Sequence, residues 1–376
     1  MDLTIIATYR CNSKCSMCDI WKHPSLPAEE IGLSTLRKLP GGFDNVNITG
    51  GEPTLRSDLS QVCEVLYPKA RKLEISTNGL YPERLEPIVH RFPDTKIRFS
   101  VEGFQQTNDR IRGEQDGFET KVRGLLRLKE LGGTDLGFAT VIQDDNIDEL
   151  VEIYKFAKQH GVELSTSALH NGFQFHKADN WPYDRLRVAR EIEELIREML
   201  RTDSVKNWFR AYLNLGLIRK ILGQQRLIPC TAGKDFIIVD PWADVYACNV
   251  RPDLLVGNLA MQSWDEIISG EKMKHARKEV EACTQNCWMV TTARTAMRNP
   301  LIPSLPKMGP LAWVVNNKLR VTVGKPVCFE KYIDYGDVAI DGPVKKRESY
   351  LGSSVKRMPT GKEEDHYSRF GPFDNR

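Results

Sequence analysis

The first half of the chain alternates short apolar, β-branched runs with stretches whose apolar residues recur at helical spacing. This alternation predicts a parallel sheet with helices on its outer side, and right-handed crossovers place all C-terminal strand ends, with the active site, on one face. Six units favour an α/β fold of the open, partial (β/α)6 barrel type. The expected strands are 3–8, 45–49, 73–76, 96–101, 136–142 and 162–167, and the expected helices lie near 28–39, 57–68, 82–91, 117–131 and 146–160.

The second half of the chain has a different pattern. Two long helices near 183–200 and 203–223 are expected to link the barrel to a smaller unit. In that unit, two apolar strands around Asp240–Ala243 predict a β-hairpin, and a helix is expected near 263–280. The predicted organisation is a barrel core at 1–168, a helical linker at 169–229, a hairpin-and-helix unit at 230–290, a basic extension at 291–340 and a loosely ordered tail at 341–376.

Composition describes an ordinary globular protein. Its 376 residues are 41% hydrophobic, and a net charge of +3 is too small to favour nucleic acid as a partner. No apolar run approaches the roughly 20 residues that span a membrane. Nine cysteines without a signal peptide indicate metal chemistry in the reducing cytoplasm. Because the first apolar run starts at residue 3, we expect no separate peptide-recognition module ahead of the barrel.

Three cysteines, Cys11, Cys15 and Cys18, follow the first expected strand with the spacing C-x3-C-x2-C. A loop this short can turn three thiolates toward one point, whereas neighbouring cysteines rarely reach disulfide geometry. Thiolates suit both zinc and iron–sulfur centres, but structural zinc normally closes a shell of four ligands. Three local ligands therefore favour an iron–sulfur cluster with one open iron, and zinc is the rival.

A second set of cysteines lies in the smaller unit. Cys230 and Cys248 stand at the outer ends of the expected hairpin, and Cys283 and Cys287 follow the expected helix. Four thiolates complete the shell of a closed iron–sulfur cluster or of a structural zinc ion. The spacing alone does not decide between these two centres.

Glycines and polar residues follow the later strands of the barrel. Two adjacent glycines after the second strand allow a ligand to approach the backbone closely, although a tight turn into a helix is the commoner reason for such a loop taken alone. Strand-end capping and surface ion pairs are the ordinary explanations for the others. These candidates are Gly50, Gly51, Glu52, Pro53, Thr77, Asn78, Ser100, Glu102, Arg112 and the loop residue His170.

In this order, the cysteine loop, Gly-Gly-Glu-Pro, Ser76-Thr77-Asn78-Gly79 and the segment from Ser100 to Gly113 resemble the motifs of the radical S-adenosylmethionine (SAM) enzymes. In that superfamily the open iron of a 4Fe–4S cluster binds SAM, whose reductive cleavage gives a 5′-deoxyadenosyl radical that abstracts a substrate hydrogen. The resemblance implies that the three cysteines hold the cluster. It also implies that SAM is positioned by Gly50, Gly51, Glu52, Pro53, Thr77, Asn78, Ser100 and Arg112.

Two further residues are candidates for catalytic roles. Glu102 stands where aspartate is commoner in the family, and it is either a ribose ligand or an acid that faces the substrate. His170 follows the sixth strand, where a proton-transfer or substrate-anchoring role competes with a solvent-facing or structural one.

Residues 230–290 resemble the auxiliary-cluster domain SPASM and its shortened form, twitch, with Ala243 at a hairpin position that is usually glycine. This resemblance implies that Cys230, Cys248, Cys283 and Cys287 hold a second 4Fe–4S cluster without an open iron, which suits electron transfer. The expected reaction is therefore oxidation of a small substrate, with a sugar-like alcohol or an anionic molecule as candidates. A flavodoxin- or ferredoxin-type reductant is the expected protein partner.

Several alternatives stay open. Cys328 is either a structural thiol or the hydrogen donor of a redox-neutral epimerase. Another reading is modification of a peptide or protein, recognised through 291–340. Residues 291–325 contain six Lys/Arg and no Asp/Glu, so this segment is a lid, a face for an anionic substrate or peripheral membrane, or a solvated surface. The non-enzymatic alternative is an iron–sulfur electron carrier or a zinc-binding scaffold.

Overall fold

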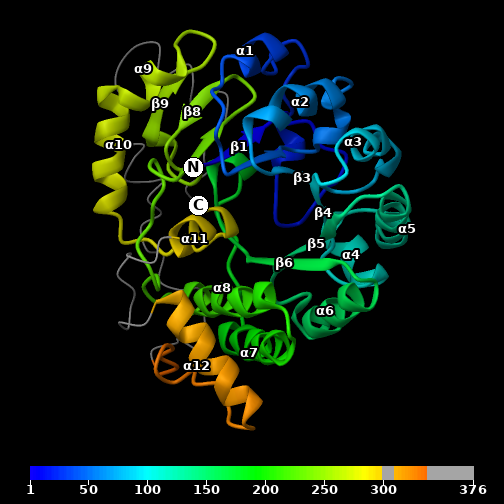
Figure 1. The fold of residues 1–376 in the computed structure, drawn as a ribbon, viewed down its shortest axis with the longest axis vertical. Coiled ribbons are helices and arrows are strands. Elements are labelled where there is room, and N and C mark those ends of the chain that lie inside the picture. Colours follow the sequence, from blue (N-terminus) through cyan, green and yellow to red (C-terminus); the bar gives the residue numbers. More distant parts are fainter. Residues whose placement is uncertain (299–308, 337–376) are drawn as a thin grey trace.

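A computed structural model describes residues 1–298 and 309–336 (Figure 1). The predicted tail at 341–376 and two parts of the basic extension, 299–308 and 337–340, lie outside these described residues.

One sheet of nine strands runs through the protein in the order β6-β5-β4-β3-β2-β1-β7-β8-β9. Neighbours among the first six strands pair in parallel, so the predicted α/β fold with an open barrel is confirmed. Each of these strands lies within two residues of its predicted bounds. They are β1 (Asp2–Ile6), β2 (Asn45–Thr49), β3 (Leu73–Thr77), β4 (Lys96–Ser100), β5 (Asp135–Ile142) and β6 (Glu163–Ala168).

The barrel helices lie along the outer side of this curved sheet (Figure 1). The helix α4 (Gln105–Arg112) was not predicted, because Ile111 is its one aliphatic residue and no apolar stripe marks it. It ends at Gly113, whose φ of +61° is in the left-handed region typical of a helix C-terminus. The predicted helices are found as α1 (Leu33–Arg37), α2 (Leu59–Leu66), α3 (Glu86–Arg91), α5 (Gly117–Glu130) and α6 (Leu150–Gln159).

The predicted linker helices, α7 (Arg185–Arg201) and α8 (Val205–Ile221), are part of the core. They pack against each other, and α8 also packs against β6. The buried Thr166 on β6 donates a hydrogen bond of 2.9 Å to Asn214 of α8. This helix pair therefore covers the barrel beside its last strand as well as connecting it to the smaller unit.

The smaller unit continues the barrel sheet. Its strand β7 (Phe236–Val239) pairs in parallel with β1, and β8 (Asp244–Tyr246) and β9 (Leu255–Asn258) follow in antiparallel order. Ala243 adopts a φ of +67° in the hairpin turn, where the side chain of Asp240 accepts bonds from the backbone N–H groups of Trp242 and Asp244. The predicted helix near 263–280 is interrupted at Gly270, giving α9 (Trp264–Ser269) and α10 (Glu271–Glu281).

The helix α11 (Val290–Met297) lies near the centre of Figure 1, between the sheet and α8. Its Arg294 donates a hydrogen bond of 2.7 Å to Asp2 and one of 3.4 Å to Glu74, both at the N-terminal ends of barrel strands. The position of α11 differs from the expected lid or solvated basic segment, because the guanidinium of Arg294 is paired with carboxylates of the barrel. The last described helix, α12 (Pro310–Thr322), packs against α7 and α8.

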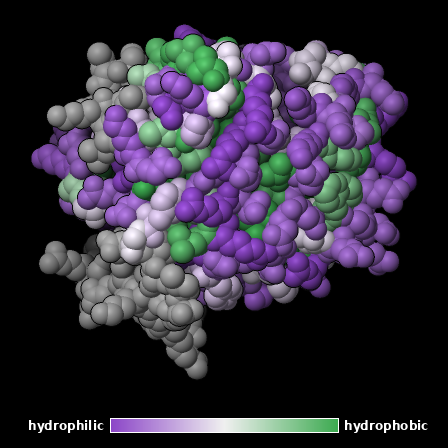
Figure 2. Space-filling view, turned by 90° about the horizontal axis from the view of Figure 1, so that it is seen from below, coloured by the Kyte–Doolittle hydropathy of each residue, from purple (hydrophilic) through white to green (hydrophobic). Residues whose placement is uncertain are grey.

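No helix among the described residues is long and apolar enough to cross a membrane. The face seen from below in Figure 2 is mostly hydrophilic, with apolar side chains confined to separate patches.

We expect Arg294→Ala to destabilise the protein, because this guanidinium is shared by two buried carboxylates, Asp2 and Glu74. Removing one partner of a buried ion pair typically costs about 3 kcal/mol or more of unfolding free energy. Thermal unfolding of the full chain should show this as a Tm lower by several degrees. Arg298→Ala is the matched control, since Arg298 is 45% exposed and does not contact Glu74. Equal shifts for the two variants would contradict the role given to Arg294.

The loss of stability in Arg294→Ala should depend on pH. Burial raises the pKa of Glu74, but Lys96 and Arg294 outweigh it and lower the pKa to about 2. A depressed folded-state pKa stabilises the protein above the unfolded value, near 4.5, and this contribution disappears as the pH falls toward 2. The effect of Arg294→Ala should shrink over the same interval.

Candidate active site

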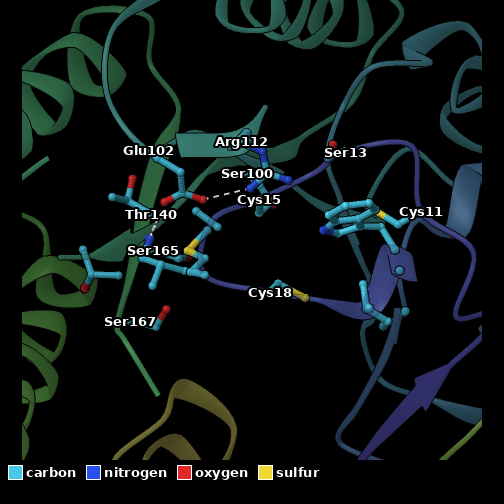
Figure 3. Close-up of a pocket in the computed structure, with 18 of the residues that line it drawn as sticks. Cys11, Ser13, Cys15, Cys18, Ser100, Glu102, Arg112, Thr140, Ser165 and Ser167 are labelled. Atoms are coloured by element: carbon cyan, nitrogen blue, oxygen red, sulfur yellow. Dashed lines mark hydrogen bonds and ion pairs between the residues drawn. The ribbon is translucent and has the colours of Figure 1, made fainter. Parts of the chain in front are cut away.

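A cavity of about 230 Å³ opens between the cysteine loop and the C-terminal ends of β4, β5 and β6. Cys11, Cys15 and Cys18 line it on one side (Figure 3). This is the end of the barrel at which the crossover argument places a site. Ser100 and Glu102, at and just beyond the end of β4, face the cysteines across it.

The cysteine loop is held by the end of α4. Its Lys14 N–H donates a bond of 3.0 Å to the carbonyl of Arg112, and Ser16 N–H donates one of 2.8 Å to that of Ile111. These carbonyls are among those that a helix leaves without an internal partner at its C-terminus. A Cβ at Gly113 would lie 2.8 Å from the carbonyl of Lys14, so the loop approaches the helix end more closely than a side chain would allow.

Gly50 and Gly51 hold the loop from its other side. The N–H of Gly51 donates a bond of 2.8 Å to the carbonyl of Thr8, and that of Glu52 donates one of 2.8 Å to Arg10. A Cβ would lie 2.3 Å from the Thr8 oxygen at Gly50, and 2.2 Å from the Arg10 oxygen at Gly51. The two glycines therefore permit backbone contact with the segment that enters Cys11, and both also line the cavity.

Glu52 lies behind the cavity wall and is fully buried. Its carboxylate accepts hydrogen bonds from Thr54 N, Thr54 Oγ1, Thr77 Oγ1 and Asn78 N, at 2.5 to 2.9 Å. Burial raises the pKa of this carboxyl while these donors oppose the shift. Glu52, Thr77 and Asn78 thus join the ends of β2 and β3, and the structure places none of the three on the cavity wall.

Arg112 reaches the cavity within a chain of four buried charges. It donates a bond of 2.9 Å to Glu102 and one of 3.1 Å to Glu114, and Glu114 pairs with Lys121. Burial lowers the pKa of Arg112, but Cys15, Glu102 and Glu114 together raise this pKa by more than burial lowers it. The guanidinium therefore stays charged. Its positive charge faces the thiol of Cys15. Glu114 and Lys121 were not among the predicted residues.

The carboxylate of Glu102 also accepts hydrogen bonds from other residues of the protein. Besides Arg112, its carboxylate accepts a bond of 2.7 Å from the N–H of Val141 on β5. A carboxylate has about four lone-pair positions, so Glu102 can still accept a bond from a ligand in the cavity.

The wall opposite the cysteines carries small hydroxyl groups. Ser100, Thr140, Ser165 and Ser167 line the cavity from three successive strands, and Figure 3 shows them on the side facing the cysteine loop. Of these four, only Ser100 was predicted. The alternation of Ser165 and Ser167 along β6 was the available signal, since residues two apart on a strand share a face.

The thiols of the loop fit a cationic iron–sulfur centre. Burial raises the pKa of Cys11 and of Cys18 to about 12 and also raises that of Cys15. Cys15 is a further cause of the shift at Cys11, and both Cys15 and Cys11 contribute to the shift at Cys18, so the three thiols lie near one another. Buried thiolates this close require positive charge, and a cluster together with Arg112 supplies it.

The four cysteines of the smaller unit converge as well. Burial raises the pKa of Cys248 to about 12, with Cys287 and Cys230 adding to the shift. Burial raises the pKa of Cys287 to about 11 in spite of the nearby cation of Lys220, and Cys283 contributes. The loop is anchored by Trp288, whose Nε1 donates a bond of 2.7 Å to the carbonyl of Leu213.

The zinc alternative fits less well. Zinc at about 2.3 Å from each sulfur would bring its thiolates within about 4 Å of one another. Within residues 1–298 and 309–336, no group of three or more Cys, His, Asp and Glu side chains is arranged to hold a single metal ion. Four thiols that converge without this tight arrangement suit a larger cluster.

Two predicted catalytic residues lie outside the cavity wall. His170 sits behind β6 with its Nδ1 at 3.2 Å from the carbonyl of Ala168. Burial, with the charge of Lys220, lowers the pKa of His170 to about 3, so the imidazole is neutral near pH 7. Cys328 follows α12, and its N–H donates to Asn317 of that helix. As placed, neither side chain faces the cavity.

Comparisons with known proteins agree with this geometry. The model of the radical SAM superfamily matches residues 5–157, and that of the SPASM iron–sulfur cluster-binding domain matches residues 230–288. The mycofactocin maturase MftC of Mycolicibacterium smegmatis is 29% identical over 275 residues, covering 68% of this chain and 67% of that protein. The probable GTP 3′,8-cyclase of Metallosphaera sedula is 27% identical, covering 75% of this chain and 90% of that protein.

A solved structure has the same fold. It is native anSMEcpe with bound AdoMet and Cp18Cys peptide, which superposes with a TM-score of 0.57 at 16% identity, over 78% of this chain and 87% of that one. Both predicted modules are thus found, in the predicted order. The chain belongs to the radical SAM superfamily, carries a SPASM-type domain, and uses 4Fe–4S clusters and SAM as its cofactors.

Proposed function

We propose that this radical SAM enzyme oxidatively modifies a side chain of a peptide or protein. Cys11, Cys15 and Cys18 hold the SAM-binding cluster, and Cys230, Cys248, Cys283 and Cys287 hold an auxiliary one. When bound, SAM and the two clusters supply radical hydrogen abstraction and a place for the electron that an oxidised substrate gives up. A flavodoxin- or ferredoxin-type protein is the proposed reductant.

The chain's own residues bind, orient and exclude water. Gly50 and Gly51 offer backbone at the cavity wall, and Ser100 can donate or accept a bond there. Arg112 supplies a cation for a carboxylate ligand while Glu102 and Glu114 fix its guanidinium in place. The hydroxyl wall of Thr140, Ser165 and Ser167 then orients the group that enters beside the cysteines.

The observation that carries the peptide reading is an exposed aromatic rim near the cavity. Asn180 donates bonds to the carbonyl of the cavity-lining Met17, at 2.8 Å, and to that of His170, at 3.2 Å. The segment is thereby fixed beside the cysteine loop, and it exposes Trp181 by 57% and Tyr183 by 89%. Exposed aromatic side chains are typical of surfaces that bind other proteins. A small alcohol held within 230 Å³ would not need them.

The comparisons point in the same direction. A maturase is among the relatives, and the structural neighbour was solved with a bound peptide. They support the peptide alternative better than the sugar-like alcohol expected first. The sugar-like alcohol is the second candidate, since the hydroxyl groups of the cavity wall can form hydrogen bonds with those of an alcohol. The name of the cyclase relative also contains a small molecule, GTP.

Gly51→Ala should remove the first cluster and spare the second, because its Cβ would lie 2.2 Å from the backbone oxygen of Arg10. After anaerobic reconstitution, two 4Fe–4S clusters predict about eight iron atoms per chain, and this variant should hold about four. Replacing Cys11, Cys15 and Cys18 together should give the same count. Gly41→Ala is the control, since nothing lies within 4 Å of a Cβ there. About four iron and one zinc in the unaltered protein would refute the auxiliary cluster.

A turnover screen tests the substrate class. The reconstituted enzyme, SAM and reductant are incubated anaerobically with peptide pools or with sugar-like alcohols. We expect 5′-deoxyadenosine to form with a peptide, whose mass falls by about 2 Da as two hydrogens are lost. Trp181→Ala should raise KM for that peptide about tenfold and leave kcat nearly unchanged, while Met261→Ala, at 86% exposure on another part of the surface, should not. Turnover with alcohols alone would contradict the proposal.

The epimerase alternative predicts a different result for Cys328. Because Cys328 lies with α12 and not on the cavity wall, we expect Cys328→Ala to retain 5′-deoxyadenosine formation and product. Loss of product with continued 5′-deoxyadenosine formation would instead identify this thiol as a hydrogen donor. Deuterium incorporation from D2O into the product distinguishes the two outcomes.

A further inference from the structure

The helix α12 is apolar on two opposite faces. Its inner face packs against α7 and α8 through Trp313 and Val314, which are fully buried or nearly so. A second set of aliphatic residues recurs at every fourth position, the spacing that keeps side chains on one face of a helix. These are Leu311, Val315, Leu319 and Val323, exposed by 64%, 48%, 60% and 66%.

This outer face is unusual for a surface helix. Ordinary surface helices carry charged and polar residues opposite their buried stripe, and a helix that is apolar on all sides is normally covered. Here the exposed stripe carries no charged residue along about three turns. Figure 2, which views the end of the molecule where α12 lies in Figure 1, shows apolar clusters on an otherwise hydrophilic surface.

The charge of the sequence around α12 indicates what binds to its exposed aliphatic stripe. Residues 282–329 contain no Asp or Glu, although the whole chain has 50 of them, and they contain six Lys/Arg. Two of these cations, Arg294 and Arg298, bond to Asp2 inside the barrel. The other four are Lys307, in a segment outside the described residues, and Lys318, Arg320 and Lys325 on or just after α12.

The contacts of α12 direct these cations to its edges. Lys318 is turned toward the protein, since it is 19% exposed and donates to the carbonyls of Leu200 and Thr202. Arg320 donates to the carbonyl of Pro326 and does not cross the aliphatic stripe. Two acids lower the local positive charge: Asp203 lies 3.9 Å from Lys318, and the exposed Glu330 follows directly after the stretch without acids.

We infer that α12 docks the protein on an anionic membrane surface. Aliphatic residues on an exposed helix face with cations beside them are the features that bind a helix in the plane of a lipid interface. A second copy of this chain fits less well, because pairing α12 with itself would bring the cations of both copies together. The stripe is too short to insert across a bilayer, so the contact is peripheral.

Vesicle binding by the full, reconstituted chain tests this inference. The probe is vesicles of phosphatidylcholine with about one third phosphatidylglycerol, and pure phosphatidylcholine vesicles are the comparison. We expect co-sedimentation with the anionic vesicles to be at least tenfold stronger, and to weaken as salt rises from 0.05 to about 0.5 M because the charge is screened. The double variant Val315→Glu/Leu319→Glu should lose at least tenfold in binding.

Leu26→Glu is the matched control, since Leu26 is 63% exposed but lies on another segment, and its binding should be unchanged. Iron content and Tm show whether each variant is folded. Binding that is absent, equal on neutral vesicles, or unchanged in the double variant would overturn the inference. So would a concentration-dependent dimer that the double variant abolishes, because the stripe would then contact a second copy. None of these outcomes depends on the substrate.

Discussion

The site depends on one constraint, the close backbone packing of the cysteine loop from two sides. On one side, the N–H groups of Gly51 and Glu52 bond to the carbonyls of Thr8 and Arg10. On the other side, the end of α4 accepts bonds from Lys14 and Ser16. Neither contact involves a thiol, so the loop that carries Cys11, Cys15 and Cys18 is held by backbone bonds that leave all three thiols available as ligands. Preorganised ligands bind more tightly than flexible ones because less freedom is lost on binding.

The same reasoning applies to the buried charges beside the loop. Glu102, Arg112, Glu114 and Lys121 balance as two anions and two cations, and each touches a neighbour of opposite sign. Removing such groups from water is tolerated only when they are paired. Arg112 therefore arrives at the cavity wall already held in place. A ligand carboxylate would meet a cation whose orientation costs little further entropy.

Much of this arrangement follows from local patterns in the sequence. The six barrel strands were predictable because parallel strands buried on both faces are continuous β-branched runs. The cysteines were predictable because their spacing serves a chemical purpose by itself, whereas Gly50 and Gly51 were assigned to the site through the resemblance to a family. The helix α4 was missed because it is polar, and the role of Arg294 because its partner Asp2 lies 292 residues away. Glu52 shows a related limit, since a motif places it near the site but only the fold shows its carboxylate bonded behind the wall.

The connection between the two modules is the last element that only the structure provides. Cys287 belongs to the auxiliary set, and Val290, three residues later, lines the cavity. Three residues span at most about 11 Å, so the auxiliary cysteines lie close to the space beside the first cluster. Trp288 fixes the segment between them, because it packs onto α8 at Gly216, where a Cβ would lie 2.0 Å from its ring. The auxiliary cysteines thus lie near the cavity that the first three cysteines line, which suits the proposed removal of a hydrogen atom and an electron from one substrate.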